Sequence, residues 1–135
     1  MITNKTTLND MKLLREWMNS FHNDPASLPI RYTIGGIEYR GIPTLFNSKM
    51  YRKIMDANIV EYVYEGTDPH SGIKVKVELY EYKDFPVVEW TAYFTNTKEK
   101  DSEILSEIFA VSTHFTGSDI KLHHGNGDFY SEDGL

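Results

Sequence analysis

Three stretches in the middle of the chain, residues 59–65, 73–82 and 87–96, alternate apolar and polar side chains and are separated only by short turns. Because successive side chains of a strand point to opposite faces, this period predicts β-strands with one face in a core. The turn at 68–72, Asp-Pro-His-Ser-Gly, has favourable turn chemistry and predicts that the first two strands form a long antiparallel hairpin. In the second arm Ile73, Val75, Val77 and Leu79 would face the core.

Further strands are expected on either side of this region. Gly35-Gly36 supplies the positive φ angles of a two-residue hairpin turn between 30–34 and 37–40. Residues 104–115 carry apolar side chains on both alternate faces, which predicts a central strand buried on both sides. The stretch 41–57 has mixed periodicity and is interpreted as a connection with one short strand.

One amphipathic helix is expected before the strands, since its apolar residues recur every three or four positions. They are Leu8, Met11, Leu14, Met18 and Phe21. Thr7 and Asp10 resemble a capping box at its start, and Asn23, Asp24 and Pro25 would end it. With no helices between the strands to make parallel crossovers, the fold class predicted for the single domain 1–135 is a mainly β, antiparallel β-sandwich with one N-terminal amphipathic helix.

Composition excludes several classes of function. The chain has a net charge of −6 with scattered Lys and Arg, which argues against nucleic acid as a partner. It has no cysteine, so disulfide scaffolds and thiolate chemistry are excluded. The sequence has neither a membrane-spanning stretch nor a secretory signal, so we expect a cytoplasmic protein, or one from which a signal has been removed. No cofactor is expected.

The order of five short segments resembles the start of family 36 glycoside hydrolases, the α-galactosidase-like enzymes. The segments are Leu14 to Trp17, Tyr32 to Gly36, Asp84 to Trp90, Phe94 to Thr97 and Gly125 to Asp128. This resemblance covers nearly the whole chain and implies a β-supersandwich related in shape to galactose mutarotase domains. It also implies a catalytic (β/α) barrel that follows the sandwich and carries the nucleophile and acid/base carboxylates. On this interpretation the chain is an N-terminal fragment that packs on that barrel and contains no catalytic residue of its own.

Tyrosines on the polar faces of the strands are candidates for contact with a galactoside. Tyr80, Tyr82 and Tyr93 lie opposite the aliphatic side chains, although cross-strand aromatic pairs also stabilise sheets without any ligand, the interpretation we favour. Trp90 could stack on a sugar, but Val88, Ala92 and Phe94 share its face and favour core packing.

Acidic and histidine residues near the C-terminus are a second group of candidates. Asp128, Glu132 and Asp133 are the best local carboxylates, and Asp128 and Asp133 would contact substrate if the tail lined the mouth of the barrel. A solvated loop is the favoured interpretation. His114, His123 and His124, with Asp119 and Asp128, have the ligand types of a metal site but no known spacing, so no metal site is predicted.

Three functions from different classes follow. The favoured one is an accessory sandwich that packs on the barrel, shapes substrate access and exposes apolar surface, so that the chain alone would associate into homo-oligomers. The alternative is a free-standing carbohydrate-binding module that uses the three tyrosines. The third is a small mutarotase-type enzyme, which needs one His and one carboxylate in the same pocket.

Overall fold

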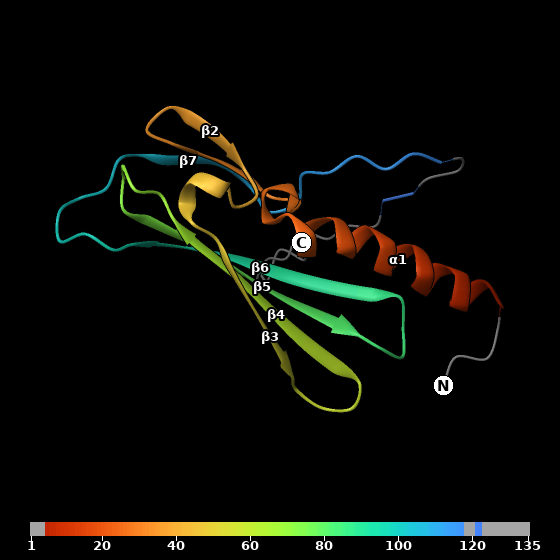
Figure 1. Cartoon of the computed structure of the whole chain (residues 1–135). Coiled ribbons are helices and arrows are strands. Elements are labelled where there is room, and N and C mark those ends of the chain that lie inside the picture. The colour runs from red at the N-terminus through yellow and green to blue at the C-terminus, as the bar shows by residue number, and fades with distance from the viewer. Residues whose placement is uncertain (1–4, 118–120, 123–135) are drawn as a thin grey trace, which may run out of the picture.

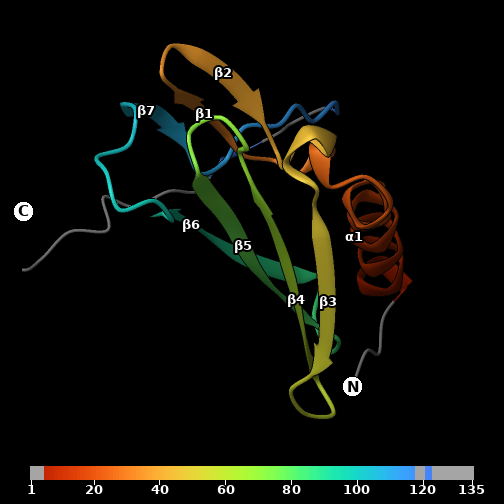
Figure 2. The same ribbon diagram turned by 60° about the vertical axis from the view of Figure 1, so that its left-hand side comes forward.

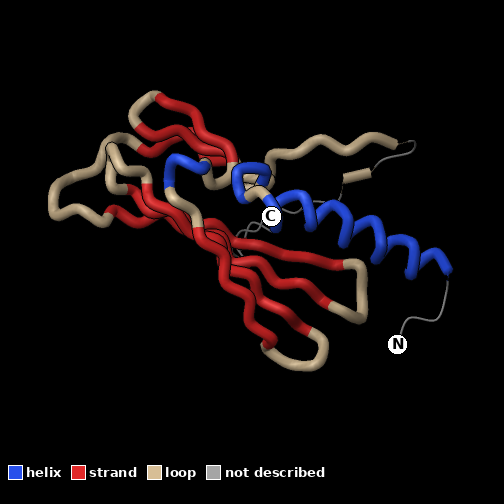
Figure 3. The backbone as a smooth tube through the Cα atoms, in the orientation of Figure 1, coloured by secondary structure: helices blue, strands red, loops and turns tan. Residues whose placement is uncertain are grey.

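The computed structural model describes residues 5–117 and 121–122, which form one long helix and two antiparallel β-sheets. The helix α1 (Lys5–Asn23) and the smaller sheet lie on the same side of the larger sheet, as Figures 1 and 2 show. Figure 3 shows how strongly strand dominates the rest of the chain. The predicted mainly β sandwich with one N-terminal helix is therefore confirmed.

The larger sheet has four strands in the order β3-β4-β5-β6. They are β3 (Lys49–Ile54), β4 (Ile59–Thr67), β5 (Ile73–Tyr82) and β6 (Val87–Asn96). Each strand is antiparallel to the previous one in the chain, with Tyr62 opposite Leu79 and Leu79 opposite Trp90. This register confirms the long hairpin and the predicted faces, since the alternate aliphatic side chains of β5 are buried.

The smaller sheet has the order β2-β1-β7. Its strands are β1 (Arg31–Ile34), β2 (Ile37–Arg40) and β7 (Leu105–Phe109). Ile34 pairs with Ile37 across Gly35 and Gly36, whose φ angles of 57° and 83° are positive as the predicted two-residue turn requires.

The core lies on the inner face of the larger sheet and is covered from two directions. The helix covers one half, where the ring of Phe21 lies 6.5 Å from that of Tyr64. The smaller sheet covers the other half, where the ring of Tyr32 meets that of Phe94 at 5.1 Å. Because an isolated sheet cannot bury its apolar face, both covers are needed to exclude water from the buried side chains of β4 and β5.

The expected start of the helix was wrong. The helix includes Thr7, so this residue cannot be the cap that precedes the first turn. The one short strand expected within 41–57 is confirmed as β3, and the same stretch also contains a short 3₁₀ helix, η2 (Thr44–Phe46), which its periodicity does not indicate. The predicted end of the helix is confirmed: Asp24 follows α1 and caps the 3₁₀ helix η1 (Pro25–Ser27).

The expectation for residues 104–115 is contradicted. Within this stretch only Leu105–Phe109 form a strand, and among the residues that the structure describes β7 pairs with β1 alone, at the edge of the smaller sheet. The pairing of β7 with β1 contains a register shift, and Glu107 has a positive φ of 49°. The side chains of β7 therefore do not alternate regularly between the two faces of the sheet. Apolar side chains on both faces therefore mark an edge strand with exposed apolar groups, instead of a strand buried on both sides.

Candidate functional site

The three candidate tyrosines all lie on the outer face of the larger sheet, opposite its core face. Tyr80 and Tyr82 are neighbours on this face of β5, whereas Tyr93 of β6 lies opposite Lys76. Tyr80 lies four positions after Lys76 in β5, which places Tyr93 about 13 Å from Tyr80 along the strand direction. The structure thus brings two of the three tyrosines together and sets the third apart.

Carboxylates surround the hydroxyl groups of these tyrosines. Tyr82 donates a hydrogen bond of 2.5 Å to Glu89, and the hydroxyl of Tyr80 lies 3.4 Å from Glu78. Glu61, directly opposite Tyr80 in the register, is the main cause that raises the pKa of Tyr80 to about 12. Both hydroxyls therefore stay protonated at neutral pH.

Trp90 packs inward, as its neighbours predicted. Its ring lies 6.0 Å from that of Trp17 in α1, and it packs against the buried core. The indole Nε1–H donates a 2.8 Å hydrogen bond to the carbonyl of Ala110, which ties the segment after β7 to the larger sheet. These contacts agree with the core packing that we favour for Trp90, which remains partly exposed.

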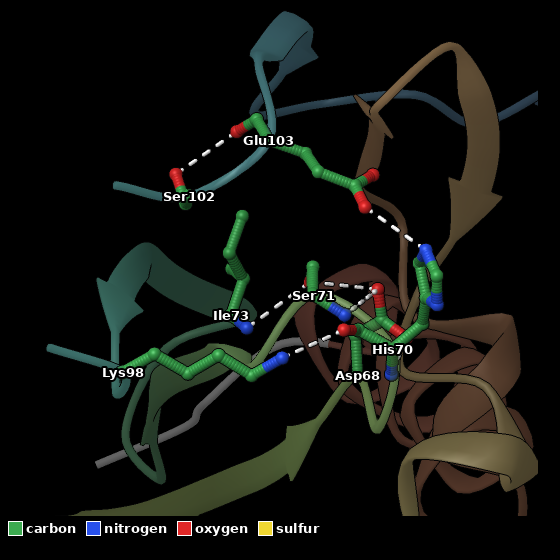
Figure 4. A network of polar contacts seen from close by, with 7 residues as sticks. All are labelled: Asp68, His70, Ser71, Ile73, Lys98, Ser102 and Glu103. Atoms are coloured by element: carbon green, nitrogen blue, oxygen red, sulfur yellow. Dashed lines mark hydrogen bonds and ion pairs between the residues drawn. The ribbon is translucent and has the colours of Figure 1, made fainter. Parts of the chain in front are cut away.

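The turn between β4 and β5 holds a buried carboxylate in a network of polar contacts (Figure 4). Asp68, only 2% exposed, accepts a hydrogen bond of 2.7 Å from the hydroxyl of Ser71 and one of 3.1 Å from the backbone N–H of His70. The imidazole of His70 pairs with Glu103 at 2.9 Å. A serine, a histidine and two acidic residues are therefore neighbours. The imidazole of His70 pairs with Glu103 and not with the hydroxyl of Ser71, so it does not activate this serine as a nucleophile. These contacts instead stabilise the turn.

A polar pocket of about 360 Å³ lies between α1 and the larger sheet, and sequence reasoning missed it. Its lining residues are Arg15, Asn19, His22, Arg52, Tyr62, Glu81 and Lys83. The three helix residues are spaced by four and three positions and so share one helix face. Arg52, Tyr62 and Glu81 alternate with outward-facing residues of their strands and lie on the core side of the sheet.

His22 forms the inner wall of this pocket. Its ring stacks on that of Tyr62 at 4.2 Å, and its Nδ1 shares a hydrogen bond with the hydroxyl of the buried Tyr64. Burial lowers the pKa of His22 below its ordinary value of 6.5, while Glu81 opposes this shift and Arg52 adds to it. One histidine and one carboxylate thus line a single pocket, which is the constellation that the mutarotase-type interpretation requires.

The remaining candidates do not form a site in the described part of the chain. His114 is exposed, and Asp119, His123, His124, Asp128, Glu132 and Asp133 lie outside the described residues. Within residues 5–117 and 121–122, no three His, Asp or Glu side chains are grouped so that they could hold a metal ion. No described helix has the length and apolar character needed to cross a membrane.

One group of exposed apolar side chains lies on β7 and on the residues just before and after it. They belong to Ile104, Ile108, Phe109, Val111 and Phe115, which we call the apolar segment. Ile104 is 77% exposed and Val111 64% exposed. After β7 the chain runs back beside α1 (Figure 1), where the ring of Phe115 lies 5.5 Å from that of Trp17.

Comparison of this chain with family models, curated proteins and solved structures finds no match. The resemblance to family 36 glycoside hydrolases therefore depends on the order of the short segments quoted above. Function must be argued from those residues and from the geometry of the molecule.

Proposed function

We propose that this chain is a non-catalytic β-sandwich domain of an α-galactosidase-like glycoside hydrolase, which packs on the catalytic (β/α) barrel. The observation that carries the proposal is the apolar segment on an edge strand. The order of the family 36-like segments supports the barrel as the partner.

An exposed edge strand with apolar side chains is a surface that proteins normally cover. Within the described residues β7 pairs with β1 on one side only, so the backbone groups of its other side have no strand partner. Ile108 and Val111 lie on and just after this edge and are both largely exposed. Covering such side chains yields about 25 cal/mol for each Å² of apolar surface removed from water.

The role of the domain would be to hold the barrel and shape the entrance for substrate. Retaining glycosidases require two carboxyl groups about 5 Å apart, and in this proposal the barrel supplies both. The sandwich contributes rigidity, because its inner face is fixed by the helix and the smaller sheet together.

A binding experiment with matched variants tests the proposal. The purified barrel of a family 36 α-galactosidase is titrated into this chain, and association is followed by calorimetry. Ile108→Lys and Val111→Lys place a charge in the apolar segment and should each weaken binding at least tenfold. Leu45→Lys is the control, since Leu45 is 67% exposed in η2, outside the apolar segment. Equal affinity of all three variants, or no binding by the unmodified chain, would contradict the proposal.

A carbohydrate-binding module is the second candidate, and the outer face of the larger sheet favours it. Tyr80 and Tyr82 combine partly exposed rings, which can stack on a sugar, with nearby carboxylates, which can accept hydrogen bonds from its hydroxyl groups. The variant with Tyr80, Tyr82 and Tyr93 all changed to Ala should then lose sugar binding while its stability stays nearly unchanged. A large loss of stability without any sugar binding to lose would count against this candidate.

A further inference from the structure

The pocket between α1 and the larger sheet is positively charged in a chain that is negative overall. Arg15, Arg52 and Lys83 line it with a single carboxylate, Glu81, whereas the whole chain carries a net charge of −6. His22 adds no charge at neutral pH, because burial lowers its pKa. The pocket therefore has an excess of cationic groups that attracts anions.

These cations are not neutralised by the protein itself. Among the described residues, Arg15, Arg52 and Lys83 take part in no ion pair, although five such pairs form elsewhere. Glu81 accepts a long hydrogen bond of 3.4 Å from Tyr62 instead of pairing with a cation. Three like charges gathered around a concavity repel each other, and a bound anion removes that repulsion.

The positions of the polar residues make an accidental surface cluster a poor explanation. The buried face of β5 is formed by Ile73, Val75, Val77 and Leu79, and Glu81 is the next residue on the same face, while the exposed Arg52 lies on the corresponding side of β3. Alternation predicts an apolar residue at the position of Glu81. Departures from the local pattern are expected where a site has to be built.

We propose that this pocket binds the phosphate group of a small phosphorylated ligand. The guanidinium groups of Arg15 and Arg52 offer the paired N–H donors that suit a phosphate, and Lys83 adds a third positive charge. Asn19 and Glu81 are available for hydroxyl groups of the same ligand. A volume of about 360 Å³ lies at the lower end of the range for small-molecule pockets.

The inner wall of the pocket is rigid before any ligand arrives. Tyr62 is buried beneath the ring of His22, and the second contact of His22 is to the buried Tyr64. A fixed wall reduces the entropy that binding would otherwise cost. This inference stands on the pocket alone and is independent of the proposed partnership with a barrel.

An NMR titration with inorganic phosphate and with galactose 6-phosphate tests the inference. We expect saturable shifts confined to the backbone amides around Arg15, His22, Arg52 and Glu81. Arg52→Gln should weaken phosphate binding about tenfold, because it removes a charge-assisted contact. Lys53→Gln is the matched control, since it removes the same charge from the next residue of β3, which lies on the opposite face of the sheet.

The second pair of variants lies on the helix. Arg15→Gln should weaken binding as Arg52→Gln does, whereas Lys12→Gln, at an exposed position paired with Glu16, should leave it within about twofold. The inference is overturned if each control weakens binding as much as its partner, or if the shifts scatter over the whole surface. It is also overturned if unphosphorylated galactose binds this pocket as tightly as galactose 6-phosphate.

Discussion

Among single residues, Gly66 is one position where close packing leaves no room for a side chain. Its backbone passes so close to the connection above the sheet that a Cβ atom would lie 2.7 Å from a methyl carbon of Ile42 and 2.9 Å from the Cβ of Phe46. Real Cβ atoms do not approach other carbons so closely, so the position admits hydrogen alone unless η2 moves. Glycine here is required by close packing of β4 against η2.

Gly66→Ala should therefore destabilise the protein through overpacking. We expect the free energy of unfolding to fall by about 1–3 kcal/mol, measured by urea denaturation. Thr91→Ala, at an exposed position of β6, serves as the control and should change stability by less than about 0.5 kcal/mol. A stability of Gly66→Ala equal to that of the unmodified chain would show that η2 does not press on β4.

His22 makes stability depend on pH. Its folded pKa is below the ordinary value of 6.5, so on acidification the unfolded chain takes up the proton first. The free energy of unfolding must then decrease as pH falls from 6.5 toward the folded pKa. The difference in stability between the unmodified chain and His22→Gln should be larger at about pH 7.5 than at about pH 5.5. Exposed His114→Gln is the control, and an unchanged difference for His22→Gln would contradict the burial of this imidazole.

Among the secondary-structure elements, α1 covers one half of the core. Phe21 and Met18 are each 1% exposed, while Leu13 on another side of the same helix is 56% exposed. An isolated helix of this length is marginal in water, so packing of its apolar stripe on the sheet provides most of its stability.

Phe21→Ala should cost about 3–5 kcal/mol, the range for a large aromatic side chain removed from a core. Leu13→Ala should cost less than about 0.5 kcal/mol, because its side chain is already largely in water. Thermal and urea unfolding of both variants checks the comparison. Equal losses would mean that α1 does not pack on the sheet as described.

Periodicity predicted the elements that have one buried and one wet face. The strands within 59–96 and the hairpin at Gly35-Gly36 were found where the sequence placed them, because local chemistry and burial agree there. In β3 every residue is exposed, so burial does not separate its two faces and the bounds of the one short strand expected in 41–57 could not be predicted. For residues 104–115 most of the large apolar side chains are exposed, a property of the strand order that no local pattern records.

At the scale of the whole molecule, the candidate pocket could not be read from the sequence. Its residues come from α1, β3, β4 and β5 and from Lys83, just after β5, and they meet only because the helix packs across the larger sheet. The one local signal was a polar residue, Glu81, at the end of an otherwise aliphatic face of β5. The tyrosines of the outer face, by contrast, follow directly from alternation, although alternation alone could not fix how far apart they lie.

We propose that this chain supports an enzyme through its apolar segment and does not itself recognise galactosides. A calorimetric titration of the chain with galactose, melibiose and raffinose distinguishes such a domain from one that binds sugar. We expect no saturable heat with any of the three sugars. Saturable binding of one sugar per chain, abolished when Tyr80, Tyr82 and Tyr93 are changed to Ala, would contradict it and establish a carbohydrate-binding module.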